Sequence, residues 1–502
     1  MASILDKLFG RKPSGPAAPA PRPSPAAATL PATQPADPGR EARILELGTE
    51  MLTRARAHKA GLLSAQFYSD ALMDWSMKDP NFKVQMFRFV DCFPQLKTPE
   101  QIFDHLNDYL SQPGVTVPGV IATALKAGGL MKGLAAGQIE KQITGMASRF
   151  IAGTDAKSAL PGLKKMWDDG IAFSVDLLGE TCVSDVEADH FCTKYLDLIE
   201  NLPAAVAQWK PQPRLESDHL GPIPRVNVSI KISALSARVD PIDTEGSIRE
   251  LMKRLVPILE VAHAKGVFVN FDMEHHQFKD LTLELFRRCC EKVPFEAGLA
   301  MQAYLKSGVE DARAMCEWAV RAKRNVTVRL VKGAYWDAET IKSEMHGWPC
   351  PVWPVKWQTD ACFEAMTDVF LDACPRGNSG GVKLALGSHN ARSIGAALAG
   401  LERRGLPRAA LELQMLHGMA DQLKYAAAEM DLRIREYVPV GDMIPGMAYL
   451  VRRLLENTSN ESWLKAGFLD NADPAALLAR PGSNPGPTPT DLLAVAPERH
   501  AL

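Results

Sequence analysis

Eight short apolar runs, separated by helix-length segments, constrain the fold of this chain more than any other feature. The runs begin near residues 171, 226, 267, 297, 325, 382, 411 and 433, and they are rich in β-branched and apolar residues. Eight such βα units predict an α/β protein built on a (β/α)8 barrel. An open, doubly wound sheet is the alternative, but it usually has fewer strands and often begins with a glycine-rich turn, which this region lacks.

The rest of the chain divides into three further regions. Residues 1–40 are rich in Ala and Pro, which predicts a disordered leader. Residues 41–165 have apolar side chains at spacings of three and four, so we expect an α-helical N-terminal domain. The barrel is predicted to span residues 166–466, and the Pro- and Gly-rich residues 467–502 are expected to form a loose tail.

Composition and charge exclude several classes of function. The 502 residues carry a formal net charge of -2, with 46% hydrophobic and 23% charged residues, which is typical of a soluble globular protein. No apolar run approaches the ~20 residues that span a bilayer. Without an excess of basic residues, we expect no nucleic-acid partner. The nine cysteines include no Cys-x-x-Cys pair, which indicates reduced thiols in a cytosol-like compartment.

Polar residues follow all eight predicted strands at their carboxyl ends, where barrel enzymes build their active sites. They are Asp176, Glu180, Lys231, Asp272, Glu274, Gln302, Arg329, Lys332, His389, Asn390, Gln414, His417 and Tyr437. One polar strand end could be chance exposure to solvent. Repetition at every strand indicates a shared pocket.

Several chemistries compete for this pocket. The pair His275 and His276 beside Asp272 suggests a metal site, but adjacent residues point in opposite directions, so we expect no metal ion. Either Lys231 or Lys332 could form a Schiff base, although an ion pair with Asp272 would keep Lys231 charged. The single histidines of "SHN" and "LHGM" remain open between a structural and a functional role. Neither a G-x-S-x-G elbow nor a phosphate-binding Walker motif is present.

The segment "MAYLVRRLLENTSNES" carries a sharper pattern than the strand ends. On a helix, Tyr449, Arg453 and Glu456 share one face at spacings of four and three, and Arg452 lies beside them. Two adjacent guanidinium groups form a good clamp for a carboxylate, because each can bind it with two parallel hydrogen bonds. The alternative is a solvated helix face, on which Arg and Glu are also common.

Seven motifs resemble the proline dehydrogenase family, and most closely the proline dehydrogenase part of the bifunctional proline utilisation A flavoenzymes. They are "FSVDLLGE", "SIKISAL", "MQAYLK", "RLVKGAYWDAE", "LHGM", "YVPVG" and "AYLVRRLLEN", in order between residues 165 and 465. Residues 41–165 resemble the helical N-terminal region of that group more loosely. The resemblance implies a distorted (β/α)8 barrel that binds FAD. It also implies oxidation of L-proline to Δ1-pyrroline-5-carboxylate, with hydride transfer to flavin N5 and electrons passed on to a quinone.

The resemblance also implies roles for individual residues. Asp272 and Arg329 would be catalytic, and Glu180 would act as a gate by pairing with Arg452. The residues around the substrate would be Lys231, Tyr437, Tyr449, Arg452 and Arg453. The residues around the cofactor would be Met273, Gln302, Arg329, Val331, Lys332, Gly333, Tyr335, Trp336, Ser388, His389, Gln414 and Glu456. Gly333 would let the backbone approach the flavin ring without a Cβ clash.

The sequence also departs from the family pattern and leaves alternatives open. His275 and His276 stand where the family often has an acidic pair, which leaves the details of that loop open. No aldehyde dehydrogenase domain follows, so we expect either a monofunctional enzyme or a piece of a bifunctional one. A hydroxyproline dehydrogenase and a non-catalytic flavin-binding regulator remain alternatives. We expect a cytoplasmic location, with peripheral contact to the inner membrane left open.

Overall fold

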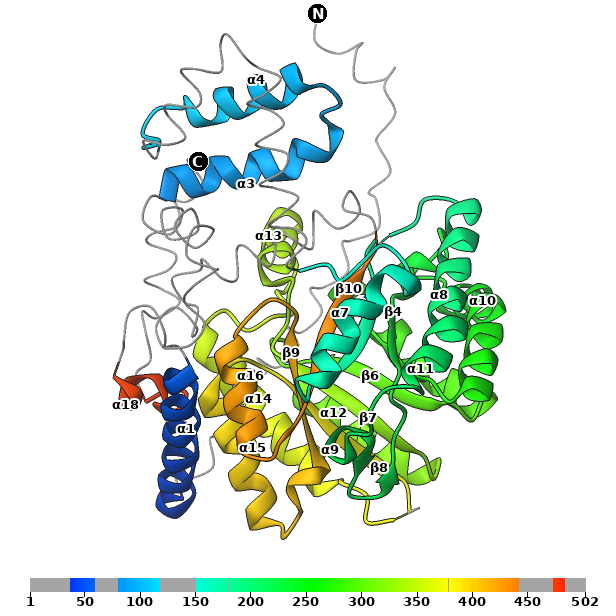
Figure 1. The fold of residues 1–502 in the computed structure, drawn as a ribbon, viewed down its shortest axis with the longest axis vertical. Helices are drawn as coiled ribbons and strands as arrows, with labels where there is room; N and C mark the ends of the chain where they lie inside the picture. The colour runs from blue at the N-terminus through cyan, green and yellow to red at the C-terminus, as the bar shows by residue number, and fades with distance from the viewer. Residues whose placement is uncertain are drawn as a thin grey trace, which may run out of the picture.

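Eight parallel strands form a closed barrel in the computed structural model (Figure 1). The structure describes residues 37–58, 80–117, 150–179, 181–377, 379–441 and 473–483. Each of the eight predicted runs contributes one strand, which confirms the (β/α)8 fold. The strands are β1 (Ala172–Leu177), β4 (Asn227–Ile230), β5 (Phe268–Phe271), β6 (Glu296–Gln302), β7 (Asn325–Val331), β8 (Gly381–Gly387), β9 (Leu411–Leu416) and β10 (Arg433–Val440). Neighbours in the chain are neighbours in the barrel, and β10 pairs with β1 to close it.

Helices alternate with the strands and cover the outside of the barrel (Figure 1). They are α8 (Asp185–Val206), α10 (Thr244–Lys265), α11 (Lys279–Lys292), α12 (Gly308–Arg321), α13 (Trp336–His346), α14 (Lys356–Asp372), α15 (Ala391–Arg403) and α16 (Asp421–Glu429). The shorter elements are α9 (Pro213–Glu216), the hairpin β2 (Ser217–Asp218) and β3 (Gly221–Pro222), and the 3-10 turns η3 (Ile232–Ala234), η4 (His276–Phe278) and η5 (Arg408–Ala410). Two helices, α13 and α14, follow β7, which departs from the simple alternation.

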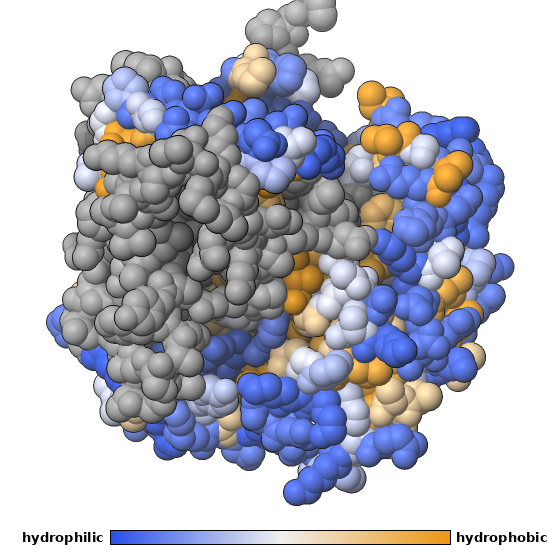
Figure 2. Space-filling view, turned by 45° about the horizontal axis from the view of Figure 1, so that its top comes forward, coloured by the Kyte–Doolittle hydropathy of each residue, from blue (hydrophilic) through white to orange (hydrophobic). Residues whose placement is uncertain are grey.

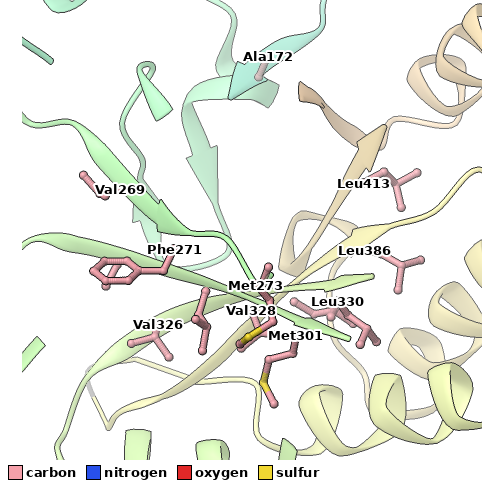
Figure 3. Close-up of a cluster of buried hydrophobic side chains, with 14 of the residues drawn as sticks. Ala172, Val269, Phe271, Met273, Met301, Val326, Val328, Leu330, Leu386 and Leu413 are labelled. Atoms are coloured by element: carbon pink, nitrogen blue, oxygen red, sulfur yellow. The ribbon is translucent and has the colours of Figure 1, made fainter. Parts of the chain in front are cut away.

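The main apolar core lies between the strands and the surrounding helices. In β7, the alternate residues Val326, Val328 and Leu330 are fully buried, and Figure 3 shows Leu330 beside Met301 of β6, its partner in the strand register. Because side chains alternate across a strand, Arg329 points to the opposite side, into the barrel. Its contacts with residues of β4 and with the residue after β5 confirm this direction. Polar side chains can therefore occupy the barrel interior without disturbing the apolar layer outside it.

The first described helix, α1 (Pro38–His58), packs against α15 and α16. Ile44 and Leu47 are buried in the same core as the barrel residues. The helices approach closely at Gly395, where an added Cβ would lie 2.9 Å from the Ile44 carbonyl oxygen. The small C-terminal helix α18 (Pro474–Leu477) lies beside α1 (Figure 1), and the buried Leu478 side chain sits over Gly48. Segments from both ends of the described chain therefore pack on the barrel and on each other.

A separate apolar cluster is formed by the helices that follow α1 in the sequence and precede the barrel. The helices α3 (Pro80–Cys92) and α4 (Pro99–Leu110), joined by η2 (Phe93–Gln95), bury Phe82, Phe89 and Leu106 against one another. The helix α7 (Ala156–Asp168) leads directly into β1, and its buried residues belong to the barrel core. The predicted helical region therefore contributes both to the barrel core and to a second, smaller core.

None of the helices in the described ranges is long and apolar enough to cross a membrane. On the face drawn in Figure 2, the described residues present a largely hydrophilic surface. Among the described residues, large apolar side chains with high exposure, such as Val183, Val186 and Ile242, are few.

Candidate active site

Five ionisable side chains meet inside the barrel at the carboxyl ends of its strands. Asp176 belongs to β1 and Arg329 to β7, while Tyr437 comes from β10. Lys231 and Asp272 directly follow β4 and β5. All except the half-buried Tyr437 are less than a tenth exposed. The parallel order of the strands brings these residues to one end of the barrel, although they are up to 261 positions apart in sequence.

Asp272 lies at the centre of these contacts. Its Oδ1 accepts a hydrogen bond from Arg329, and its Oδ2 accepts one of 2.6 Å from the Tyr437 hydroxyl. The Lys231 Nζ lies 3.5 Å from the same Oδ2 and pairs more closely with Asp176. The Arg329 guanidinium also lies over the Tyr437 ring, 4.9 Å from its centroid. Each charge is therefore paired, as buried charges require.

Burial and pairing decide the protonation states in this cluster. Burial, the largest influence, raises the pKa of Asp176 to about 6, although the Lys231 ammonium opposes the shift. Burial alone would lower the pKa of Lys231, but Asp176 and Asp272 together outweigh it and raise the pKa. Burial, reinforced by the same two carboxylates, raises the pKa of Tyr437 well above its usual value. Lys231 is therefore charged at neutral pH, which argues against a Schiff base there.

The loop after β5 is held by buried hydrogen bonds. Gln302, at the end of β6, donates its Nε2 to the carbonyl oxygens of Met273 at 3.3 Å and of Glu274 at 3.1 Å. The Glu274 carboxylate in turn accepts bonds from the Ser233 backbone N–H and hydroxyl, at 3.2 and 2.5 Å. These contacts fix the backbone that directly follows Asp272 and tie it to the turn that follows Lys231.

The chain after β7 turns sharply, as the run "RLVKGAYWD" suggests. Gly333 has φ +132°, and an added Cβ would lie 2.4 Å from the Tyr304 ring. The close approach that this glycine permits is therefore to Tyr304. Next to it, Lys332 pairs with Asp360 of α14 and lies over the Phe363 ring. Burial lowers the pKa of Lys332, and the Asp360 carboxylate opposes that shift.

Tyr335 and Trp336 lie at the start of α13, above the end of β7. The Trp336 indole donates a 2.8 Å hydrogen bond to the Trp353 carbonyl oxygen. The Tyr335 ring packs against His275, with 4.3 Å between centroids, and the His275 Nδ1 lies 3.3 Å from a Glu339 carboxylate oxygen. His275 therefore faces α13. Within the described ranges, no group of three or more His, Cys, Asp or Glu side chains could hold a metal ion.

The two single histidines have distinct partners. The Leu416 backbone N–H donates to the His389 Nε2 at 3.1 Å, so this nitrogen is an acceptor and carries no proton. His417 Nδ1 lies 2.5 Å from a Glu436 carboxylate oxygen. Ser388 accepts a hydrogen bond from the Asn390 backbone, which turns the chain into α15. Both histidines thus help to fix the ends of β8, β9 and β10.

Five of the predicted site residues lie outside the described residues: Glu180, Tyr449, Arg452, Arg453 and Glu456. In contrast, Asp176, which is one of the predicted strand-end residues but was assigned no catalytic or binding role, pairs with Lys231 in the cluster. The signal was present, because β1 is buried along its whole length and still carries Ser174 and Asp176. Polar residues in a fully buried strand require partners, and in a barrel these lie inside it. Tyr304 is not among the predicted residues, since its contact with Gly333 depends on the tertiary fold.

A closed parallel barrel with ionisable side chains at the carboxyl ends of its strands is the architecture of a (β/α)8-barrel enzyme. The chain belongs to the proline dehydrogenase family, whose model matches residues 159–466. A model of the proline utilization A N-terminal domain matches residues 41–150.

Individual relatives agree with this assignment. The bifunctional protein PutA of Klebsiella aerogenes is 30% identical over 340 residues, which cover 66% of this chain and 24% of that protein. The proline dehydrogenase of Deinococcus radiodurans is 28% identical over 325 residues, 64% of this chain and 90% of that protein. The structure is also similar to the crystal structure of proline utilization A from Bdellovibrio bacteriovorus inactivated by N-propargylglycine, with a TM-score of 0.80 and 39% sequence identity. The match covers 89% of this chain and 44% of that chain. The chain thus spans about a quarter of the length of the PutA protein of Klebsiella.

Proposed function

We propose that this protein is an FAD-dependent dehydrogenase that oxidises L-proline to Δ1-pyrroline-5-carboxylate. The observation that carries the proposal is the buried cluster around Asp272, at the strand ends of a barrel of the proline dehydrogenase family. A cluster of carboxylates, cations and a phenol offers groups of both signs to a small zwitterion, whose carboxylate and amine can each find an opposite charge.

The residues near the cluster fit a flavin. The Oε1 atoms of Gln302 and Gln414 are buried and have no hydrogen-bond partner among the described residues. Such oxygens favour a ligand that brings N–H or O–H groups, because leaving them unpaired costs about 1–3 kcal/mol. On the strands that flank Arg329 and Val331, the same barrel face carries the small residues Ala300, Ala385 and Gly387, which allow a planar ring to approach the strands.

When bound, FAD supplies the acceptor for the hydride that leaves proline. The described residues proposed to hold it are Met273, Gln302, Arg329, Val331, Lys332, Gly333, Tyr335, Trp336, Ser388, His389 and Gln414. Among them, Arg329 keeps a positive charge in a buried pocket, where it favours the arrival of negative charge. Lys332 and Lys356 both pair with Asp360, so a second region of positive charge follows β7 and can face an anionic part of the cofactor.

The substrate is proposed to lie against Asp272, Lys231 and Tyr437. Lys231 is held between Asp176 and Asp272, so it presents a fixed cation to a carboxylate without needing to reorganise. The Tyr437 ring offers an apolar surface to the pyrrolidine ring, while its hydroxyl remains bonded to Asp272. We propose that Tyr449, Arg452 and Arg453 complete the pocket, with Arg452 paired to Glu180 and Glu456 near the cofactor.

The decisive experiment combines spectroscopy with a steady-state assay of the purified protein. We expect a yellow protein whose FAD is released by denaturation, and turnover of L-proline with an artificial dye as electron acceptor. Trans-4-hydroxy-L-proline serves as the competing substrate and is expected to react more slowly. A colourless protein that does not respond to added FAD would contradict the proposal. Bound FAD without turnover of either substrate would instead favour the non-catalytic regulator.

We further propose that a quinone is the natural electron acceptor and that the protein is cytoplasmic with peripheral membrane contact. These two points have their support in the family resemblance. The test is to compare proline oxidation with a soluble quinone analogue and with oxygen, and to measure sedimentation with lipid vesicles. Faster reoxidation by oxygen than by the quinone would contradict the first point, and absence of vesicle binding would contradict the second.

A further inference from the structure

Three buried polar side chains form a column beneath the active-site cluster. Ser229, on β4, is fully buried, and its Oγ lies 3.3 Å from both Nη1 and Nη2 of Arg329. Ser174, on the neighbouring β1, has its Oγ 3.2 Å from that of Ser229. Asn227, two residues before Ser229, accepts a 2.7 Å hydrogen bond from the Ser174 hydroxyl through its Oδ1. The column therefore runs from the Arg329 guanidinium down into the barrel.

The hydrogen bonds of this column can have only one direction. The Asn227 Oδ1 is an acceptor, so the single proton of Ser174 is used there. The bond between the two serines must then be donated by Ser229, which leaves the lone pairs of the Ser229 oxygen free for Arg329. Every oxygen in the column therefore accepts its hydrogen bond from the side of the Arg329 cation. Hydrogen bonds that are aligned in this way strengthen one another.

The column gives Arg329 a further acceptor in addition to its other partners. Asp272 binds the guanidinium at Nη2, and the Tyr437 ring lies against its flat face. Without the Ser229 hydroxyl, Arg329 would keep those two partners but lose the Ser229 Oγ as an acceptor. Its terminal nitrogens would then be free to shift toward Asp272. On a buried strand, β-branched and apolar residues are usual, so a buried Ser hydroxyl is favourable only where it makes hydrogen bonds, as Ser229 does with Arg329 and Ser174.

We propose that Ser229, supported by Ser174 and Asn227, is a positioning residue that sets where the Arg329 charge lies in the pocket. This proposal rests on the proposed function, in which that charge favours reduction of a bound flavin. The role is indirect, because Ser229 acts through Arg329. It is also specific, because one serine oxygen contacts both terminal nitrogens of the guanidinium.

The test is a double-mutant cycle read out by the midpoint potential of the bound FAD. Arg329→Met should make FAD harder to reduce. Ser229→Ala should shift the potential in the same direction. We expect the corresponding equilibrium constant between oxidised and reduced enzyme to change by at least about threefold. Adding Ser229→Ala to Arg329→Met should produce no further shift, because the positioned charge is already gone. An unchanged potential in Ser229→Ala, or additive shifts in the double variant, would overturn the proposal.

A matched control and a second measurement complete the design. Ser247 is equally buried and exchanges hydrogen bonds with Asp240 at the start of α10, outside the pocket, so Ser247→Ala should leave the potential unchanged. If the proteins bind no FAD, their absorption spectra show that the proposed function has failed. The same cycle is then measured by urea unfolding of the apoprotein. We expect the change in the unfolding equilibrium constant of the double variant to differ by about threefold or more from the product of the changes in the two single variants. Equality between the two would overturn the positioning role.

Discussion

Asp272 shows how a single side chain can organise a buried site. It follows β5 and contacts Lys231 after β4, Arg329 on β7 and Tyr437 on β10, and thereby joins four strands at one end of the barrel. Its removal would leave the Arg329 charge short of a partner in a region from which water is largely excluded. Breaking a buried pair by removing one partner costs more than the pair itself contributes, because the remaining charge is uncompensated.

We therefore expect Asp272→Ala to lower proline turnover on the order of a hundredfold or more while FAD is retained. Steady-state kinetics and the absorption spectrum of the same preparation provide the measurement. Asp311→Ala is a suitable control, because Asp311 pairs with Lys279 on the outside of the barrel, and turnover should be nearly unchanged. Full activity in Asp272→Ala would remove Asp272 from the site.

Arg453 lies outside the described residues, and its role remains a prediction from the sequence. If it binds the proline carboxylate, Arg453→Met should raise the KM for proline by roughly thirtyfold to a thousandfold, since a charge-assisted two-point contact is worth ~2–4 kcal/mol. The proline mimic tetrahydro-2-furoic acid should lose affinity in parallel. A surface arginine would change either value by no more than an exposed ion pair does, about 0–1 kcal/mol. Inhibitor binding that survives the substitution would place the carboxylate elsewhere.

At the scale of secondary-structure elements, a buried ion network joins β9 to β10. The Glu412 carboxylate accepts hydrogen bonds from Arg435 at 2.8 Å and from Arg433 at 3.1 Å, and Gln414 also donates to it at 2.8 Å. Burial, the largest single influence, acts to raise the pKa of Glu412, but Arg435 and Arg433 outweigh it and lower the pKa to about 2. The network thus connects the two strands that complete the barrel before it closes on β1.

The stabilisation by Glu412 should depend on pH in a defined direction. Because its folded-state pKa lies below the value in the unfolded chain, the carboxylate stabilises the fold above pH 4.5 and loses that effect as the pH falls toward 2.

We expect Glu412→Gln to lower the free energy of unfolding near pH 6 by about 3 kcal/mol, and the difference from the unaltered protein to shrink below pH 5. Urea titrations at several pH values measure it. Glu429→Gln, on the surface, should have little effect at any of them. A difference that is independent of pH would contradict this account.

At the scale of the whole molecule, Arg392 connects segments from both ends of the described chain. It is buried on α15 and binds the carboxylates of Glu41 on α1 and Glu364 on α14. It also donates a 2.9 Å hydrogen bond to the carbonyl oxygen of Leu478. The N-terminal and C-terminal segments are therefore held at one point on the barrel, in addition to the packing of Leu478 against Gly48.

Loss of this junction should destabilise the whole fold. We expect Arg392→Met to lower the free energy of unfolding by about 3–5 kcal/mol, because two buried carboxylates and a carbonyl oxygen lose their donor. The matched control is Arg43→Met, which removes an exposed pair between α1 and Glu402 and should cost no more than about 1 kcal/mol. Chemical unfolding of both variants provides the comparison, and equal effects would show that the junction is no more than a surface contact.

The barrel could be predicted because its signals are local. Each strand is a short apolar run, each helix has apolar residues at spacings of three and four, and eight repeats of this pattern leave few alternatives. The strand-end rule then directed attention to Lys231, Asp272, Arg329 and Tyr437, which the structure brings together. The same rule placed Asp176 at the end of its strand, but its pairing with Lys231 depends on the tertiary structure.

The sequence by itself determined the order of strands and helices, the end of the barrel that carries the ionisable groups, and the chemical types available there. These follow from periodicity and from the direction of parallel strands. Only the tertiary structure decided which charges pair, because pairing depends on distances across the barrel between residues far apart in the chain. It also decided that Tyr304 lies against Gly333, that α1 packs on the barrel, and that Ser229 lies beneath Arg329. The pairing affects stability because these charges are buried. A charge that is removed from water and left without a partner costs free energy, so its partner must be one that the fold places nearby.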